Sequence, residues 1–422
     1  STAYAYTVSA VDAAGNESPQ SAAVITTTQA KTGNTINAAS CSQTDVQAAI
    51  DAAVDGDTVV VPVGTCTWST FVDVTKAISI IGAGSGTGGT KLTATNALNN
   101  GFFNVHNATS SQLMRISGFY FEMTNWTPLW AIKMYLGNAL DNVRIDHNTF
   151  NQSGVAQIEI GGSKGVIDHN YFYNGNKAIS FTAGSRAQAD ASWASMTAGA
   201  GDALFIEDNY FIDNASYTQS YGNEKIGTYN GGKLVIRYNN FDATAFPLVD
   251  PRDGAILTFT PFMAHGSACG GCNASSYGYW QTPNSDARRG QSLMEIYNNT
   301  IAGKRVDFPF AVRGSSNLIF NNTFTISTTW GTYIALAEEE YGSNNGLVPA
   351  RTDWPAEDQV HNTFIWNNTR NGSQLTSANI SVTPDATKIQ LDRDYFLHAP
   401  QASGGKETFV CASGVTECNG AA

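Results

Sequence analysis

Three acidic residues occupy one position of a repeated phrase. Asp146, Asp168 and Glu207 occupy it in VRIDHNTF, GVIDHNYF and LFIEDNYF. If each phrase is one coil of a stack, the carboxylates of Asp146 and Asp168 lie about 5 Å apart. Two carboxylates that close raise the pKa of one of them and suit a retaining glycosidase, and they can equally bind calcium. The alternative is a solvated face on which the acids pair with neighbouring cations, namely Arg144, Lys164 and Arg237.

A second pair of residues carries positive charge. Arg289 in ARRG and Arg313 in AVRG are 24 residues apart, which is close to one coil of such a stack. Two stacked guanidinium groups repel each other unless an anion lies against them. A uronic-acid lyase uses such cations to neutralise the sugar carboxylate, so that the adjacent carbon can lose its proton. The alternative is structural, with Asp286 and Asp307 paired to the arginines.

The other parts of this candidate lyase site come from the same half of the chain. A free arginine is a poor base, so the candidates for proton removal are His265, Lys304 and Lys233. A long insertion at about 242–290 supplies aromatic rings that suit a sugar ring. The candidate substrate-binding residues are Arg252, Arg288, Arg305, Tyr277, Tyr279 and Trp280.

The repeated phrase also predicts the elements that position these residues. It contains one asparagine at a constant place, at Asn148, Asn170, Asn209, Asn239, Asn299, Asn322 and Asn368. Separations of 22 and 23 residues predict single coils of three short strands. The larger separations predict either coils with insertions or two coils.

The side chains around each asparagine have expected directions. Isoleucines three positions earlier are expected to point into the core, at 145, 167, 206, 236, 296 and 319. Phenylalanines two positions later form a second internal stack, at 150, 172, 211, 241 and 324. The asparagine is expected to take the left-handed bend and to hydrogen-bond along the stack. His147 and His169 are expected to point inward. The pattern predicts an all-β fold, a right-handed parallel β-helix.

The N-terminal region predicts a cap and a preceding module. Val46, Ala49 and Ile50 follow a polar capping residue, Ser42, at helical spacing, as in a short helix that covers one end of a solenoid. Residues 1–30 alternate around a Gly-Asn turn and resemble the last two strands of a fibronectin type III module. Residues 31–40 are then a linker and the start of the cap, and 41–422 the β-helix with its C-terminal cap. We expect further modules N-terminal in the native chain.

Taken together, SCSQTDVQAAI, GDTVVVPVGTCTW and the repeated I-x-x-N-[TYN]-F resemble the pectate-lyase-like β-helix superfamily over roughly residues 38–400. The superfamily includes lyases, hydrolases, epimerases and non-catalytic adhesins, so the resemblance implies the fold more than the activity. In its lyases the base is typically a lysine or arginine. VRGSSNLIFNNTF resembles the strand that carries an active-site arginine there, which implies this role for Arg313. No acidic calcium cluster precedes it.

Composition and cysteine usage limit the setting. A net charge of −12 argues against general nucleic-acid binding, and no apolar run is long enough to span a membrane. The six cysteines form close pairs, Cys41 with Cys66, Cys269 with Cys272, and Cys411 with Cys418. Paired cysteines predict disulfides in a secreted or cell-surface, bacterial protein. The alternative for the CGGC stretch is a metal or redox motif.

Three functions fit this sequence. The first is a polysaccharide lyase that cleaves uronic-acid-containing glycan, with the arginine pair in its cleft. The second is a glycoside hydrolase that uses Asp146, Asp168 or Glu207. The third is a non-catalytic adhesin or fibre subunit that self-associates. The sequence calls for no cofactor with certainty, and calcium is the candidate metal.

Overall fold

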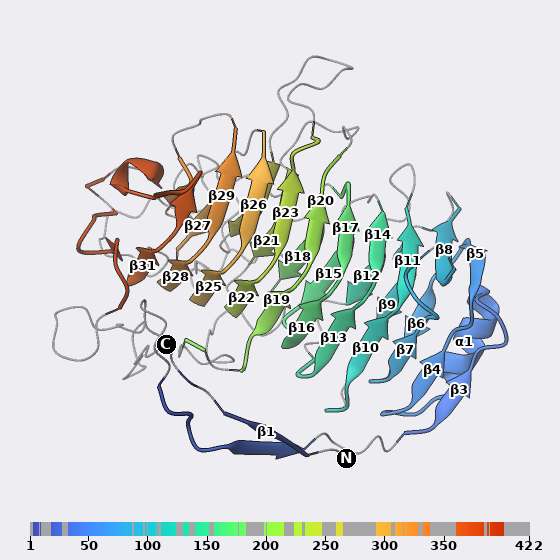
Figure 1. Ribbon diagram of the computed structural model, residues 1–422. Coiled ribbons are helices and arrows are strands. Elements are labelled where there is room, and N and C mark those ends of the chain that lie inside the picture. Colours follow the sequence, from blue (N-terminus) through green and yellow to red (C-terminus); the bar gives the residue numbers. More distant parts are fainter. Residues whose placement is uncertain are drawn as a thin grey trace, which may run out of the picture.

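Three long sheets dominate the computed structural model of this chain (Figure 1). The structure describes residues 3–7, 9, 18–27, 33–86, 88–95, 98, 100–106, 108, 111–123, 130–134, 140–151, 156–175, 177–182, 198–199, 201–214, 223–229, 233–246, 259–264, 293–304, 309–314, 316–327, 332–337, 360–383, 386–387 and 389–400.

Sheet I has twelve strands, in the order β3 (Thr35–Asn37), β4 (Thr58–Val60), β7 (Ser79–Ile81), β10 (Met114–Ser117), β13 (Val143–Asp146), β16 (Gly165–Asp168), β19 (Leu204–Glu207), β22 (Lys233–Arg237), β25 (Leu293–Tyr297), β28 (Ser316–Phe320), β31 (Thr363–Trp366) and β35 (Tyr395–Phe396). Sheet II has eleven, β5 (Gly64–Trp68), β8 (Thr90–Ala94), β11 (Phe119–Glu122), β14 (Thr149–Asn151), β17 (Tyr171–Tyr173), β20 (Tyr210–Ile212), β23 (Asn240–Ala243), β26 (Thr300–Gly303), β29 (Thr323–Ile326), β32 (Thr369–Arg370) and β33 (Ser373–Gln374). Sheet III has ten, β6 (Val72–Val74), β9 (Phe103–Val105), β12 (Ile132–Met134), β15 (Ile158–Gly161), β18 (Ile179–Thr182), β21 (Asn223–Tyr229), β24 (Phe259–Ala264), β27 (Phe310–Arg313), β30 (Ile334–Ala337) and β34 (Ile380–Thr383).

The chain visits sheets I, II and III in turn, and each round is one coil. Within the sheets, every neighbouring pair is parallel except β32 and β33. The phrase isoleucines pair in register, Ile145 with Ile167, Ile167 with Ile206, and so on to Ile319. Each separation between phrases is therefore one coil, and the long ones carry insertions. The expected insertion at 242–290 contains β24, which is itself a strand of sheet III.

The core runs along the inside of the stack. The six phrase isoleucines are buried, each at most 1% exposed, as predicted. The phenylalanine stack is also confirmed, because Phe150, Phe172, Phe211 and Phe241 lie with parallel rings 4.5 to 4.9 Å apart. Burial of such rings removes apolar surface from water at about 25 cal/mol per Å². The repeat thus places one apolar layer on the next.

The asparagines form the predicted ladder, but the bend lies elsewhere. Each side-chain amide donates to the next asparagine's side-chain oxygen at 2.9 to 3.1 Å, from Asn148 to Asn368. The left-handed φ belongs to the residue before each ladder asparagine, such as His147, Asp208 and Asn298 at 54°, 54° and 55°. The prediction that the ladder asparagine bends the chain is wrong. Its amide has to stay inside, where it bonds backbone carbonyls.

The same shift reverses the predicted direction of two histidines. The side chains of His147 and His169 are 57% and 52% exposed. Each occupies the left-handed position, which turns its side chain out of the stack, so the prediction that they point inward is wrong. The bend thus presents one side chain per coil to solvent.

One end of the stack is capped as predicted. Helix α1 (Gln43–Ala52) buries Val46, Ala49 and Ile50, and the Ser42 side chain accepts a hydrogen bond from the Asp45 amide at 3.2 Å. Cys41 and Cys66 form a disulfide beside it, as predicted. Figure 1 shows α1 beside β3 and β4 at one end of the stack, and β31 near the other. The short helix η3 (Ser377–Asn379) lies between β33 and β34.

The N-terminal segment forms a separate hairpin-like pair. β1 (Ala3–Tyr6) and β2 (Val24–Thr27) are antiparallel, with Ala3 opposite Thr27. Its assignment to a fibronectin type III module stays a prediction, as do the domain boundaries. Among the described residues, no helix is long and apolar enough to cross a membrane.

Candidate active site

The outer face of sheet III carries a row of polar residues on successive coils. Inward residues alternate with outward ones, so Ile132, Ile158 and Ile179 lie in the core while their neighbours face outward. The register places Lys133 beside Glu159, and Glu159 beside Ser180. Neighbouring strands are about 4.8 Å apart, so these three side chains form one contiguous row.

Glu159 is the chemically unusual member of this row. Burial raises its pKa, and the positive charges of Lys133 and Lys177 only partly offset that effect. Its Oε2 is buried and has no hydrogen-bond partner within the described part of the chain. A buried carboxyl oxygen without a hydrogen-bond partner needs an explanation, and a proton-transfer role is one.

A tryptophan lies next to the same row. Lys133 Nζ is 4.0 Å from the centre of the Trp130 ring. Trp130 Nε1 is also buried without a hydrogen-bond partner among the described residues. An indole ring with a free N–H, beside a cation and an acid, combines an apolar surface with polar groups that can orient a ligand.

A second carboxylate lies further along the sheet. Glu224 forms an ion pair with Lys177 and is buried. A Cβ on Gly227 would lie 2.9 Å from Glu224 Oε1, so this carboxylate covers Gly227. Gly227 pairs with Ser180, which pairs with Glu159. The backbone that the Glu224 carboxylate covers is therefore two strand spacings, roughly 10 Å, from the backbone of Glu159.

The described members of the predicted cationic set lie on three different sheets. Arg313 ends β27 in sheet III and is half-buried. Lys233 begins β22 in sheet I, is fully buried, and pairs with Asp202 Oδ1 at 3.3 Å. Lys304 follows β26 in sheet II and is exposed. Arg313 and Lys233 share the corner between sheets III and I, two coils apart, whereas Lys304 lies at another corner.

The rest of that set lies outside the described residues and stays a prediction. These residues are Arg252, His265, Tyr277, Tyr279, Trp280, Arg288, Arg289 and Arg305. The predicted pairs Cys269 with Cys272 and Cys411 with Cys418 lie outside the described residues as well.

The predicted carboxylate column exists, with each acid held by an arginine. Asp146, Asp168 and Glu207 pair in register on sheet I. Arg115 Nη2 contacts Asp146 Oδ2 at 2.5 Å, Arg144 Nη2 contacts Asp168 Oδ2 at 2.7 Å, and Arg237 Nε contacts Glu207 Oε2 at 2.5 Å. The acids are thus paired with cations, which is the alternative to a catalytic acid pair. Arg115, rather than the expected Lys164, is one of these cations. Lys164 lies 3.9 Å from Asp141 instead.

Asp146 is the most deeply buried acid of this column. Burial alone raises its pKa, but hydrogen bonds from Arg115 and His147 and the charges of Arg115 and Arg144 outweigh it, so the pKa lies below its ordinary value. Its side chain is not exposed at all. Asp146 is therefore ionised at neutral pH and serves as the anchor of an ion-pair network.

Asp146→Asn is expected to destabilise the protein by roughly 3 kcal/mol at pH 7, since it leaves Arg115 without its charge partner. Because the folded-state pKa of Asp146 is lowered, the ion pair contributes fully to the free energy of unfolding at pH values above the unfolded-state pKa of about 4. That contribution is lost as pH falls through the folded pKa, so the difference between the two proteins should shrink below pH 4. Urea unfolding at pH 7 and pH 3 measures it. Asp141→Asn, on an exposed pair, is the control. A pH-independent difference would contradict the assignment.

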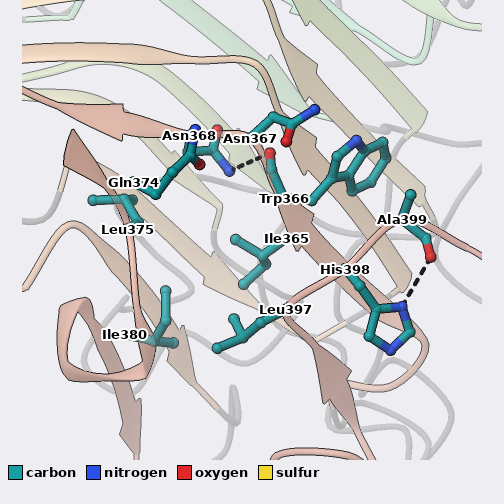
Figure 2. Close-up of a pocket in the computed structure, with 10 residues that line it drawn as sticks. All are labelled: Ile365, Trp366, Asn367, Asn368, Gln374, Leu375, Ile380, Leu397, His398 and Ala399. Carbon is teal, nitrogen blue, oxygen red and sulfur yellow. Dashed lines mark hydrogen bonds between the residues drawn. The ribbon is translucent and has the colours of Figure 1, made fainter. Parts of the chain in front are cut away.

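One cavity of about 710 Å³ lies away from sheet III's polar row (Figure 2). It is at the C-terminal end of the stack, where Figure 2 shows Ile365, Ile380 and Leu397 around it. These apolar side chains pack against the main core. Its described lining residues include no Asp, Glu, Lys or Arg, and His398 is the titratable side chain among them.

Metal binding by a larger ligand cluster has no support in the described part of the chain. No group of three or more His, Cys, Asp or Glu side chains there could hold a metal ion. The calcium site considered from the sequence therefore has no candidate among these residues.

The three parallel sheets and the coil-by-coil register define the chain as a right-handed parallel β-helix protein. No protein-family profile matches the chain, and no curated protein matches its sequence. Similar solved structures are carbohydrate-active enzymes. An alginate lyase from Paenibacillus sp. str. FPU-7 is 10% identical, with 86% of this chain and 98% of that chain covered, at a TM-score of 0.44.

Two further solved structures differ from it in the activity they are named for. The DFA-IIIase from Arthrobacter chlorophenolicus A6 without its lid is 12% identical, with 88% of this chain and 100% of that chain covered, at a TM-score of 0.43. The Family 28 exopolygalacturonase of Yersinia enterocolitica is 12% identical, with coverages of 94% and 83% and a TM-score of 0.43. These similarities carry no argument about which reaction this chain performs.

Proposed function

We propose that the protein is a secreted enzyme that cleaves a uronic-acid-containing polysaccharide by β-elimination on the outer face of sheet III. The observation that carries the proposal is Glu159, a half-buried side chain with a raised pKa and a buried, unpartnered Oε2. A raised pKa keeps a carboxylic acid protonated closer to neutral pH, where it can donate a proton to the departing sugar oxygen.

The neighbours of Glu159 support an acidic substrate. Lys177 supplies positive charge beside it, and Arg313 lies four strands further along the same sheet, in position to contact another sugar unit of a polymer. Such cations bind a uronate carboxylate and stabilise the charge that develops when the adjacent proton leaves. Lys133, next to Glu159 on the adjacent coil, is the proposed base and removes the proton as its neutral amine. Trp130 offers its ring to a sugar.

A glycoside hydrolase is the second candidate, on a different observation. The Glu224 carboxylate covers backbone that is two strand spacings, roughly 10 Å, from the backbone of Glu159, near the separation that lets an inverting hydrolase place a water between acid and base. In that reaction Glu159 protonates the leaving oxygen and Glu224 activates the water. The earlier hydrolase candidates Asp146, Asp168 and Glu207 stay a prediction, with the ion pairs described above as the alternative.

Secretion has separate support. The Cys41–Cys66 disulfide is expected in an oxidising compartment, as for secreted and cell-surface proteins. The proposed reaction makes polysaccharide the proposed partner.

A panel of acidic and neutral polysaccharides tests these proposals. Ultraviolet absorbance of unsaturated ends together with new reducing ends on a uronate polymer would support elimination. Reducing ends without absorbance, lost in Glu224→Gln, would support hydrolysis. Turnover on none of the polymers would overturn both and favour the adhesin or fibre hypothesis.

A further inference from the structure

The polar row on sheet III continues past Lys133, onto coils that the proposed reaction does not use. Strands β6, β9, β12 and β15 are successive neighbours in this sheet (Figure 1). Their register places Asn104 beside Lys133, and Asp73 beside Asn104. The residues on either side of Asn104 in β9 lie in the core, so its own side chain leaves the strand on the outer face. Asn104 is therefore two coils from Glu159, on the far side of Lys133.

The side chain of Asn104 has one hydrogen-bonding atom unused. Its Nδ2 donates to Asp73 Oδ1 at 3.3 Å. A carboxylate only accepts hydrogen bonds, so the amide nitrogen must face Asp73 and the amide oxygen must face away from it. That oxygen, Oδ1, is buried and has no hydrogen-bond partner in the described part of the chain. Asn104 is only 3% exposed, so Oδ1 requires a donor other than bulk water.

Trp130 lacks a partner of the opposite kind. Its Nε1–H can only donate, is buried, and has no acceptor among the described residues. Lys133 Nζ is 4.0 Å from the centre of the indole ring, which places the ring beside the same point of the row. Asn104 Oδ1, Trp130 Nε1 and Glu159 Oε2 are thus three buried atoms without described partners, on three successive coils of one face. Buried polar groups are normally hydrogen-bonded, so this gathering indicates a ligand that supplies the partners.

The missing partners define the chemistry of that ligand. Asn104 requires a donor, and Trp130 requires an acceptor. A carboxylate or an ester could serve Trp130 but not Asn104, because neither donates a hydrogen bond. An ammonium group could serve Asn104 but not Trp130. Hydroxyl groups both donate and accept, so neighbouring hydroxyls of one sugar ring satisfy both residues, and the indole ring adds an apolar surface.

We propose that Asn104 and Trp130 bind free hydroxyls of the uronate unit that loses its proton, and that this contact makes the enzyme selective for uronate units without O-acetyl groups. This selectivity rests on the proposed function, which supplies the class of ligand and the order of the reacting groups. Lys133 removes the proton, and Glu159 protonates the leaving oxygen. Lys133 lies between Asn104 and Glu159, so the rest of that unit, with its hydroxyls, extends from Lys133 towards Asn104.

Acetylation removes the group that this subsite recognises. An O-acetyl group replaces the hydroxyl proton, so nothing is left to donate to Asn104 Oδ1. A site built to hydrogen-bond a hydroxyl discriminates strongly against an analogue that lacks it, because the site's own buried polar atom stays unpaired. The acetyl ester can still accept from Trp130, so the discrimination should depend on Asn104.

Calorimetric titration of the full chain carrying Glu159→Gln, which should bind without rapid cleavage, tests the proposal. The probes are oligomannuronate and oligogalacturonate, each with free hydroxyls and after chemical acetylation. The tighter-binding of the two free oligomers should bind at least tenfold more tightly than its acetylated form. Adding Asn104→Ala should weaken binding of the free oligomer about tenfold and abolish the preference. Adding Trp130→Phe, which keeps an aromatic ring and removes the N–H, should weaken binding of both forms.

Asn151→Ala is the matched control in the same background. Asn151 Nδ2 also donates to a carboxylate on the preceding coil, Glu122 Oε1 at 2.8 Å, but on sheet II. Its loss should change neither the affinity nor the preference. Urea unfolding checks that Asn104→Ala is folded, and Trp130→Phe tests the same subsite independently of that result.

Equal affinity for free and acetylated oligomers, an equal loss in Asn151→Ala, or no binding of either oligomer would overturn the subsite. Turnover of the polysaccharide panel by the unaltered chain separates this result from failure of the proposed function. Elimination that is indifferent to acetylation would leave the proposed function in place and remove the subsite. Acetyl-sensitive binding that Asn104→Ala abolishes, without elimination by the unaltered chain, would keep the subsite and remove the reaction.

Discussion

Glu159→Gln is expected to lower the rate of polysaccharide cleavage by about 100-fold to 10,000-fold, the range typical for loss of a general acid. Glutamine keeps the shape of the side chain and cannot donate the acidic proton. The unaltered enzyme should lose activity as pH rises through the raised pKa of Glu159, because the carboxyl must be protonated to act. The residual activity of the variant should lack that limb.

Stability should move in the opposite direction from activity. A carboxyl whose folded pKa is raised destabilises the fold at neutral pH, because the folded state disfavours its charged form. Glu159→Gln should therefore melt at the same temperature as the unaltered protein or slightly higher. A residue that lowers stability while serving a reaction is the usual signature of a functional site.

Glu122→Gln is the matched control for this experiment. Glu122 also faces outward next to a lysine, Lys91 at 3.2 Å, but lies on sheet II. It should leave cleavage unchanged. Full activity in Glu159→Gln, or an equal loss in Glu122→Gln, would remove Glu159 from the mechanism.

The repeated phrase predicted two of the three sheets well. It spans a whole sheet I strand, the bend and the start of a sheet II strand, so its periodicity follows the core directly. The strands of sheet III share no phrase: IEIG, ISFT and NEKIGTY have little in common beyond inward apolar residues. The sequence alone therefore gave no way to place Glu159 beside Lys133 on neighbouring coils. The weak signal was an isolated acid within an apolar strand.

The carboxylate column shows a different limit of sequence reasoning. The phrase correctly stacked Asp146 on Asp168, but the partner that decides its chemistry is Arg115, on a coil that has no copy of the phrase. A single sequence cannot distinguish two neighbouring acids that interact with each other from two acids that are each paired with an arginine. Similarly, the left-handed bend was predicted at the ladder asparagine, because asparagine favours left-handed angles. It lies one residue earlier, because the ladder requires the asparagine amide to stay buried.

Asn209→Ala is expected to destabilise the protein by roughly 4 kcal/mol, the largest effect on stability that we predict. Asn209 Oδ1 accepts from the Asn170 backbone amide and side chain, both at 3.0 Å. Its amide donates to Ile167 O and Glu207 O at 2.8 and 2.9 Å. Alanine removes the acceptor of the buried Asn170 backbone amide and a donor from each of the two carbonyls, at about 1 to 3 kcal/mol for each group left unsatisfied. Urea unfolding measures the change.

The ladder role can be separated from the bend by a control one position before a ladder asparagine. Asn298 has a φ of 55° and precedes Asn299. Asn298→Gly should be neutral or slightly stabilising, because glycine takes left-handed angles without strain. Hydrogen exchange gives a local readout: Asn209→Ala should speed exchange of the Asn170 amide, which loses its acceptor. If both variants unfold at the same urea concentration, the ladder contributes no more than the bend does, and the repeated asparagine is retained for some reason other than stability.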